Sequence, residues 1–218
     1  MKDTLVPAPT QIRSVNEQHV EEALRVIARK WTTPIVHILA PQRAPMRVCD
    51  IAARLPFTGN VYTLLDRMHS DGLVTRTGNH TAVEYQLNAH GRALPPVHQA
   101  LFAWSWTHLP IGTTVFAERV EDAAQRLRAR KSTAVVQALN ELGPTSILRV
   151  AEKAGLHPGY AQRRLVRLGS DGLVARTGPH HGAPYMLTDA GSALGPVYTI
   201  IERWRELGRR NSAVSQEQ

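Results

Sequence analysis

The chain has 218 residues, a formal net charge of +8 and a pI near 10.2, which favours a polyanionic partner, either nucleic acid or an acidic membrane surface. No run of about 18 apolar residues is present, and Pro7 and Pro9 interrupt the stretch where a signal peptide would need an apolar core. The sequence therefore predicts a cytoplasmic protein without a membrane span, and its single cysteine, Cys49, excludes an internal disulfide.

Hydrophobic periodicity places helices and strands along the first half of the chain. Residues 1–16 lack periodicity and are expected to form an extended arm. The elements expected next are a helix from Glu17, a helix restarting at Pro34, a compact helix from Arg47 to Leu55, a helix capped by Thr58, strands at 73–77 and 83–87, and a long helix that Asn88 caps and Pro95-Pro96 bends. Two short helices, a tight turn and a β-hairpin predict a winged helix-turn-helix.

An internal repeat follows. The stretch Ser70–Gly78 returns one hundred residues later as 170–178, with only Thr75 exchanged for Ala175. Identities continue at this offset through Tyr85/Tyr185, Leu87/Leu187, Gly91/Gly191, Leu94/Leu194, Pro96/Pro196, Val97/Val197 and Trp104/Trp204. A register this long without a gap indicates duplication. The expected divisions are an arm at 1–16, a first domain at 17–109, a linker at 110–117, a second domain at 118–210 and a polar tail at 211–218.

The second half repeats the order of elements. Helices are expected at 120–130, 132–142, 146–155 and 158–169, strands near 173–177 and 184–187, and a final helix from Thr188 to about Leu207. The fold class predicted is mainly α with small β-hairpin wings (α+β): two tandem winged helix-turn-helix domains related by pseudo-two-fold symmetry.

The first half resembles the HxlR-type winged-helix transcription regulators, which are close to MarR-like proteins. Residues that carry the resemblance are Lys30-Trp31-Thr32, Ser70–Val74, Val83–Leu87, Gly91-Arg92, Pro96-Val97 and Trp104. The second half is a degenerate copy that lacks an equivalent of Trp31, since Lys131 is followed by Ser132 where Lys30 is followed by Trp31. The resemblance implies homodimers whose terminal helices pair two winged domains over a palindrome. Here both domains lie on one chain, so the expectation is a monomer with an intramolecular pseudo-dimer, the alternative being a homodimer of chains.

Thiol sensing is not expected. Redox-sensing members of this family carry a cysteine ahead of the first helix, whereas residues 16–20 contain none. Cys49 is interpreted as a small core residue, because free cysteines are commonly buried.

Recognition in this fold comes from the outer face of the third helix. In the second half, a core line of Ala161, Leu165 and Leu168 places Arg163 opposite the core. Arginine pairs with guanine and glutamine with adenine in the major groove. The residues expected on or beside this DNA-binding face are Tyr160, Gln162, Arg163, Arg164 and Arg167.

The corresponding face in the first half is less basic. Thr63 lies opposite the core line, Asn60 and Arg67 flank it, and Asp66 would repel phosphate. Residues 17–109 hold nine Lys/Arg against seven Asp/Glu, whereas residues 120–211 hold fourteen against eight. Because non-specific affinity scales with the phosphates neutralised, the second half is expected to supply more of it.

Each wing carries an arginine and a histidine at equivalent positions. These residues, Arg76 and His80 in the first half and Arg176 and His180 in the second, complete the expected DNA-binding set. His180 and His181 do not suggest a metal site, because neighbouring strand residues point to opposite faces and no further ligand completes the set. No cofactor or metal is expected. The four tryptophans are interpreted as core or interface anchors, with a ligand pocket between the domains as the alternative.

The leading hypothesis is a sequence-specific bacterial regulator of transcription that binds double-stranded DNA at an asymmetric operator, with repression and activation both left open. A plasmid replication initiator with tandem winged helices is one alternative. A protein-interaction adaptor is the other, although the basic third helix of the second half argues against it. No catalytic constellation is present, so the protein is not expected to be an enzyme. The identity of any small-molecule effector cannot be read from the residues.

Overall fold

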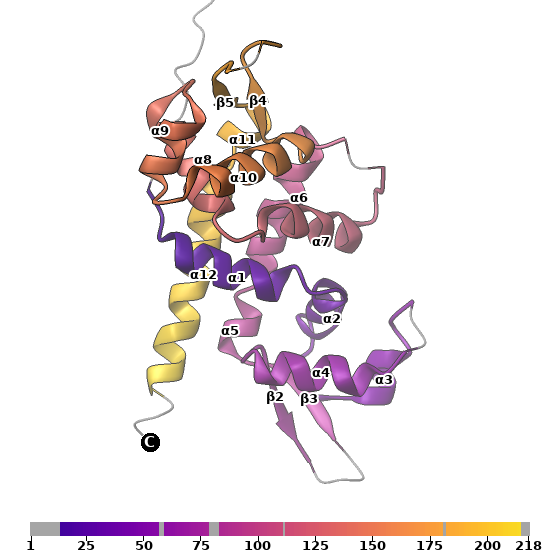
Figure 1. The fold of residues 1–218 in the computed structure, drawn as a ribbon. Coiled ribbons are helices and arrows are strands. Elements are labelled where there is room, and N and C mark those ends of the chain that lie inside the picture. Colours follow the sequence, from indigo (N-terminus) through magenta and orange to yellow (C-terminus); the bar gives the residue numbers. More distant parts are fainter. Residues whose placement is uncertain (1–13, 57–58, 79–82, 111, 181, 215–218) are drawn as a thin grey trace, which may run out of the picture.

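The computed structural model of the chain describes residues 14–56, 59–78, 83–110, 112–180 and 182–214. The first half contains α1 (Glu17–Ile27), α2 (Thr32–Leu39), β1 (Met46–Arg47), α3 (Val48–Ala52), α4 (Val61–Ser70), β2 (Val74–Thr77), β3 (Glu84–Leu87), α5 (Ala89–Arg92) and α6 (Pro95–His108). The second half contains α7 (Phe116–Leu127), α8 (Ser132–Leu142), α9 (Ile147–Lys153), α10 (Pro158–Ser170), β4 (Val174–Arg176), β5 (Tyr185–Leu187), α11 (Asp189–Ser192) and α12 (Gly195–Val214). Figure 1 shows the two hairpins at opposite ends of the molecule.

Local sequence explains where α4 and α10 begin and end. The Asn60 side chain accepts a hydrogen bond from the Thr63 N–H, so Asn60 is the N-cap of α4. Thr58, the cap expected from the sequence, lies outside the described residues. Pro158 opens α10, where its missing N–H costs nothing. Both helices stop before a glycine of positive φ, Gly72 at 68° and Gly172 at 77°.

Each hairpin is antiparallel. In the first half β3 pairs with β2, with Val74 opposite Leu87, and β1 adds a third strand on the other side of β3. The two-residue β1 was not expected, because it follows Pro45 and is too short to give an alternating pattern. In the second half a single bridge from Thr145 to Tyr185 takes its place.

The long helices expected after Asn88 and Thr188 are each divided in two, which corrects the predictions of one bent helix after Asn88 and one continuous helix after Thr188. Asn88 and Thr188 do act as N-caps, but of the four-residue α5 and α11. Pro95 and Pro96 lack the N–H that would continue α5, so α6 starts afresh with proline in its first turn. A Gly195-Pro196 pair stands at the corresponding restart of α12.

The core is continuous across both halves. Helix α1 packs on α12, α7 packs on α6, and α6 packs on α12. Two tryptophans connect the halves, each donating a hydrogen bond to a backbone carbonyl of the other half. Trp104 Nε1 donates to the Ala190 carbonyl at 2.9 Å, and Trp204 Nε1 donates to the His90 carbonyl at 3.0 Å. Both partners differ by one hundred positions between the two bonds, so the same contact is made twice with the halves exchanged.

A second pair of contacts has the same reciprocity. The Trp31 N–H donates to the Glu121 carboxylate at 2.8 Å, and the Lys131 N–H donates to the Glu21 carboxylate at 2.5 Å. Both donors precede a helix and have positive φ, 73° for Trp31 and 65° for Lys131. The first helix of each half therefore satisfies the backbone at the start of the second helix of the other half.

Two side chains lie elsewhere than expected. Trp104 and Trp204 are buried, but Trp106 is 54% exposed and stacks on Phe102. Cys49 is exposed and not a core residue, because Val48 and Ile51 occupy the inward positions of the short α3. Within the described part of the chain, no helix is both long and apolar enough to cross a membrane.

Candidate nucleic-acid interface

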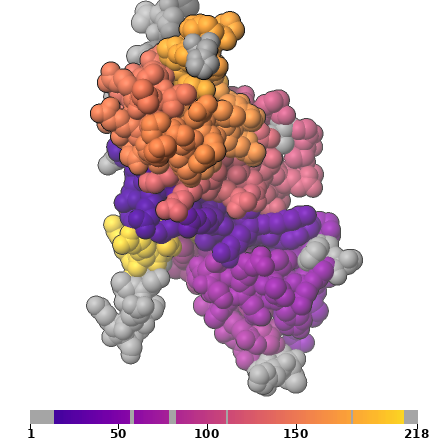
Figure 2. Space-filling view, in the orientation of Figure 1, coloured from indigo at the N-terminus to yellow at the C-terminus, as the bar shows by residue number. Residues whose placement is uncertain are grey.

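Helices α4 and α10 present their outer faces to solvent in the same way. Val61, Leu65 and Met68 are buried along α4, as the sequence predicted. Ala161, Leu165 and Leu168 are buried at the equivalent positions of α10, so this prediction is confirmed too. The residues opposite these lines, Thr63 and Arg163, are exposed. In Figure 2, α10 (orange) and the first-half winged region (purple) lie on one face with α1 (indigo) between them.

Arg163 is an exposed cation of α10, opposite its buried line. Its guanidinium carbon lies 5.8 Å from the centre of the Tyr160 ring, and the described residues offer it no carboxylate partner. Gln162 beside it is exposed. These two side chains are able to reach base edges without first breaking an ion pair.

Tyr160 and Arg164 are turned toward the protein. The Tyr160 hydroxyl donates to the Arg130 carbonyl at 3.2 Å, and Arg164 Nη2 donates to that hydroxyl at 3.1 Å. Both side chains are half-buried. They join α10 to the turn between α7 and α8, and this geometry gives them a positioning role for the helix.

Arg167 is tied to the end of its own helix. Its Nε lies 3.1 Å from Asp171, whose side chain is 6% exposed, while the Arg167 side chain remains 62% exposed. In the first half the equivalent Asp71 is paired with Arg29. Burial raises the pKa of Asp71, and Arg29 and Arg67 oppose this rise. Arg67 is thereby left without an ion pair among the described residues.

The outer face of α4 has few free polar groups. Asn60 is engaged in capping, and the Asp66 carboxylate accepts a hydrogen bond from the Tyr85 hydroxyl at 2.8 Å. Burial, followed by Asp66, raises the pKa of Tyr85 to about 12. Tyr62 is 54% exposed and offers an apolar surface instead. Thr63 and Arg67 are the exposed side chains of the predicted set that are not committed to capping.

The described wing residues Arg76, Arg176 and His180 are exposed, but the two arginines make different contacts. Arg76 lies in β2, opposite Tyr85. Arg176 Nη2 donates to the His180 carbonyl at 3.0 Å, which fixes the arginine against its own loop. His180 is exposed, whereas His80 and His181 lie outside the described residues.

The geometry is that of a helix-turn-helix with an adjacent wing, and a family comparison agrees. Residues 26–112 match the HxlR-like helix-turn-helix family. Among solved structures, the reduced form of the transcriptional regulator YodB from B. subtilis is 26% identical, covering 43% of this chain and 94% of that one with a TM-score of 0.36. No curated protein matches the chain.

Outside the HxlR-like segment, the last turn of α7 and the turn between α7 and α8 supply basic residues that sequence reasoning missed. Arg126, Arg128 and Arg130 line a cavity of about 580 Å³ together with Arg164 and Arg167 of α10. Arg126 is paired with Asp122 at 2.7 Å. The alternating arginines of residues 126–131 were the available signal, but periodicity assigned them to a helix end and gave them no further role.

One group of side chains has the composition of a metal site. Ligand atoms of His19, Glu202 and Glu206 lie within 4.8 Å of one another where α1 meets α12. The Arg209 guanidinium contacts His19 Nε2, and the Asn16 N–H donates to Glu202 at 2.5 Å. A cation at the histidine nitrogen opposes the binding of a second cation there, so these residues are better described as a polar interface.

Proposed function

We propose that the protein is a sequence-specific DNA-binding transcriptional regulator in which one chain supplies both winged domains of a pseudo-dimer. The observation that carries the proposal is the exposed, unpaired Arg163 opposite the buried line of α10, inside a helix-turn-helix of a basic protein. The match of residues 26–112 to the HxlR-like helix-turn-helix family supports DNA binding for the first half.

The pairing of the two halves is supported by their reciprocal contacts. In a two-fold interface, residue i of one copy meets residue j of the other, and j meets i in return. The bonds from Trp104 to Ala190 and from Trp204 to His90 follow this rule at an offset of one hundred, as do those that Glu121 and Glu21 accept. A chain that pairs internally in this way does not require a second chain to place two recognition helices on DNA.

The outward residues of the two helices differ, and this difference supports an asymmetric operator. Arg163 and Gln162 on α10 suit direct contacts with bases, whereas Thr63 and Tyr62 at the same places on α4 do not offer the same donors. The half-site under α10 is therefore expected to be the more strictly specified.

Sequencing of the DNA that co-purifies with the protein from its own cells tests the proposal. Enrichment of a few promoter regions that share a motif is the expected result. Recovery of a replication origin alone would favour an initiator instead, and recovery of no enriched DNA would contradict DNA binding as the function. A Thr63→Ala and Arg163→Ala double variant, purified in parallel, serves as the matched control and should lose the enrichment.

A further inference from the structure

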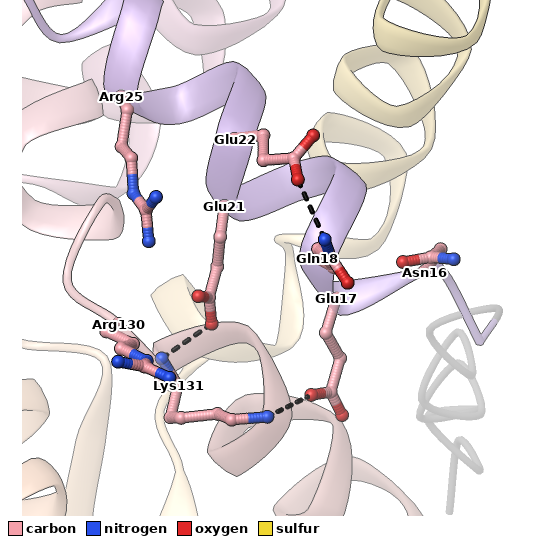
Figure 3. A pocket seen from close by; sticks show the side chains of 8 residues that line it. All are labelled: Asn16, Glu17, Gln18, Glu21, Glu22, Arg25, Arg130 and Lys131. Carbon is pink, nitrogen blue, oxygen red and sulfur yellow. Dashed lines mark hydrogen bonds and ion pairs between the residues drawn. The ribbon is translucent and has the colours of Figure 1, made fainter.

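A charged cavity lies where α1 meets the turn between α7 and α8. Its volume is about 520 Å³, and Figure 3 shows side chains from both elements around it. The lining residues are Asn16, Glu17, Gln18, Glu21, Glu22, Arg25, Arg130 and Lys131. The cavity therefore combines three carboxylates with three cations.

Each carboxylate already has a partner within the protein. Glu21 accepts the Lys131 N–H, and Glu17 lies 3.5 Å from Lys131 Nζ. Glu22 accepts hydrogen bonds from Gln18 and Arg205, both at 2.9 Å, and these two bonds lower its pKa. Each carboxylate of the cavity wall is thus engaged by a group built into the fold, Glu17 and Glu22 by a cation and Glu21 by a backbone N–H.

Two of the cations have no such partner. Arg25 and Arg130 are exposed, and the ion pairs of the described residues include neither of them. In Figure 3, Arg25 extends from α1 toward the turn that carries Arg130. An anion that binds both must approach from solvent, because the carboxylates along the wall disfavour a small anion inside the cavity.

These two arginines lie between the helices proposed to enter the major groove. The Arg130 carbonyl accepts the Tyr160 hydroxyl of α10, and Arg130 shares a second cavity with Arg164 and Arg167. At the other side, Arg29 just after α1 pairs with Asp71 at the end of α4. A duplex that contacts both α4 and α10 has to pass over this segment.

We infer that Arg25 and Arg130 bind backbone phosphates of the duplex between the two half-sites. The inference rests on the proposed function, and it adds sequence-independent contacts from α1 and from the turn after α7, outside the recognition helices and wings. Backbone phosphates are the repeated anions of the proposed ligand, and each one neutralised by an arginine releases a condensed counterion. The site thus lends affinity and register without reading sequence.

The salt dependence of DNA binding tests this inference. Binding of a fluorescent mixed-sequence duplex of about 30 base pairs, long enough to span both half-sites, is measured at several salt concentrations. Each lost phosphate contact reduces the slope of log K against log salt by about 0.9, so an Arg25→Gln and Arg130→Gln double variant should lose about 1.8. The matched control, Arg203→Gln with Arg210→Gln on α12, removes the same charge from exposed positions and should keep the wild-type slope.

The outcomes separate the two proposals. Equal slopes for the double variant and its control would overturn the assignment of these arginines while leaving DNA binding intact. Absence of duplex binding by the wild-type protein would overturn the proposed function and this inference with it. Calorimetry with inorganic phosphate gives an independent arm: binding in the millimolar range that the double variant abolishes would assign the pair to a small anion instead of the duplex backbone.

Discussion

Arg163 differs from the other arginines of α10 because no ion pair or hydrogen bond is seen for it among the described residues; its guanidinium lies near the Tyr160 ring. Arg164 is bound to Tyr160, and Arg167 is bound to Asp171. A guanidinium without an ion pair reaches a base edge at no cost in broken salt bridges, and bidentate contact with guanine needs its full fork of donors.

Replacing Arg163 by alanine should therefore weaken binding to the preferred site by about 1 to 3 kcal/mol while changing binding to random DNA much less. Arg167→Ala should weaken both by similar amounts, since its exposed nitrogens suit a phosphate and its Nε is committed to Asp171. Titration of each variant against both DNAs separates the roles. An Arg163→Ala protein that discriminates as well as wild type would remove this residue from sequence recognition.

Buried histidines make stability depend on pH. His98 is fully buried with its Nδ1 3.3 Å from His37 Nε2, and burial, followed by the charge of His37, lowers the pKa of His98 to about 3. Its ordinary value is 6.5, so the neutral form stabilises the fold fully above about pH 6.5, and this contribution is lost as pH falls toward the folded value. Glu121 acts in the opposite direction, because burial raises its pKa to about 7.

Comparison of a His98→Gln variant with the wild type isolates the contribution of His98 to the pH dependence of stability, because Glu121 is present in both proteins. The variant should be less stable than wild type at pH 7.5, but the deficit should shrink by about 2 kcal/mol at pH 5, where the unfolded wild-type chain gains a proton that the folded chain excludes. Urea denaturation at the two pH values measures this. A deficit independent of pH would mean that His98 is protonated in the fold.

At the residue scale, helical periodicity predicted which side chains face inward but not which outward ones are engaged. The buried lines of α4 and α10 follow from spacing alone. The half-burial of Tyr160 depends on a carbonyl thirty residues earlier, and that contact leaves no trace in local pattern. Cys49 shows the same limit, since composition favours burial and the register of a five-residue helix decides otherwise.

Among the elements, the junction between wing and α5 depends on a glycine. A Cβ at Gly91 would overlap the Leu73 carbonyl oxygen, and a Cβ at Gly191 would overlap that of Leu173. The Leu73 carbonyl cannot move away freely, because it accepts the Asn88 N–H at 3.1 Å. The repeated glycine was visible in the sequence, whereas the backbone that approaches it was not.

Gly91→Ala should cost about 3 kcal/mol of unfolding free energy, the upper part of the range for overpacking, because the obstacle is backbone. Gly169→Ala is the matched control. It places a methyl group 3.6 Å from the Val174 carbonyl oxygen, an ordinary contact, and should add about 0.5 to 1 kcal/mol through helix propensity. Chemical denaturation of both variants tests the pair, and a neutral Gly91→Ala would show that the α5 junction can shift.

Element order was largely predictable, and the exceptions have physical reasons. The alternation of apolar and polar residues located the hairpins, and apolar residues at helical spacing located most helices. Proline chemistry predicted a disturbance after Asn88, yet whether a helix bends or restarts depends on packing: Trp104 of α6 and Trp204 of α12 must reach backbone carbonyls of the opposite half. Such reciprocity across one hundred residues cannot be read from a local pattern.

For the whole molecule, the continuous core implies that the halves fold together. Helix α1 belongs to the first half in sequence but packs on α12, and α7 packs on α6. Both tryptophan bonds are satisfied within one chain, so this contact does not require a second chain. Light scattering at micromolar concentration should give a mass near the 24.1 kDa of one chain. A stable particle of twice this mass would contradict the intramolecular pairing.

The final prediction concerns the shape of the target site. Identical recognition helices read a palindrome with half-sites about one helical turn apart. Here α10 carries Arg163 where α4 carries Thr63, so the same base pairs cannot suit both helices. Selection from random DNA should return an asymmetric motif with guanine opposite Arg163 in one half-site and weak constraint in the other. Thr63→Arg, which makes the two outermost residues alike, should shift the selected sites toward symmetry. A wild-type motif that is a perfect palindrome, equally constrained in both halves, would mean that the difference between α4 and α10 is not used for recognition.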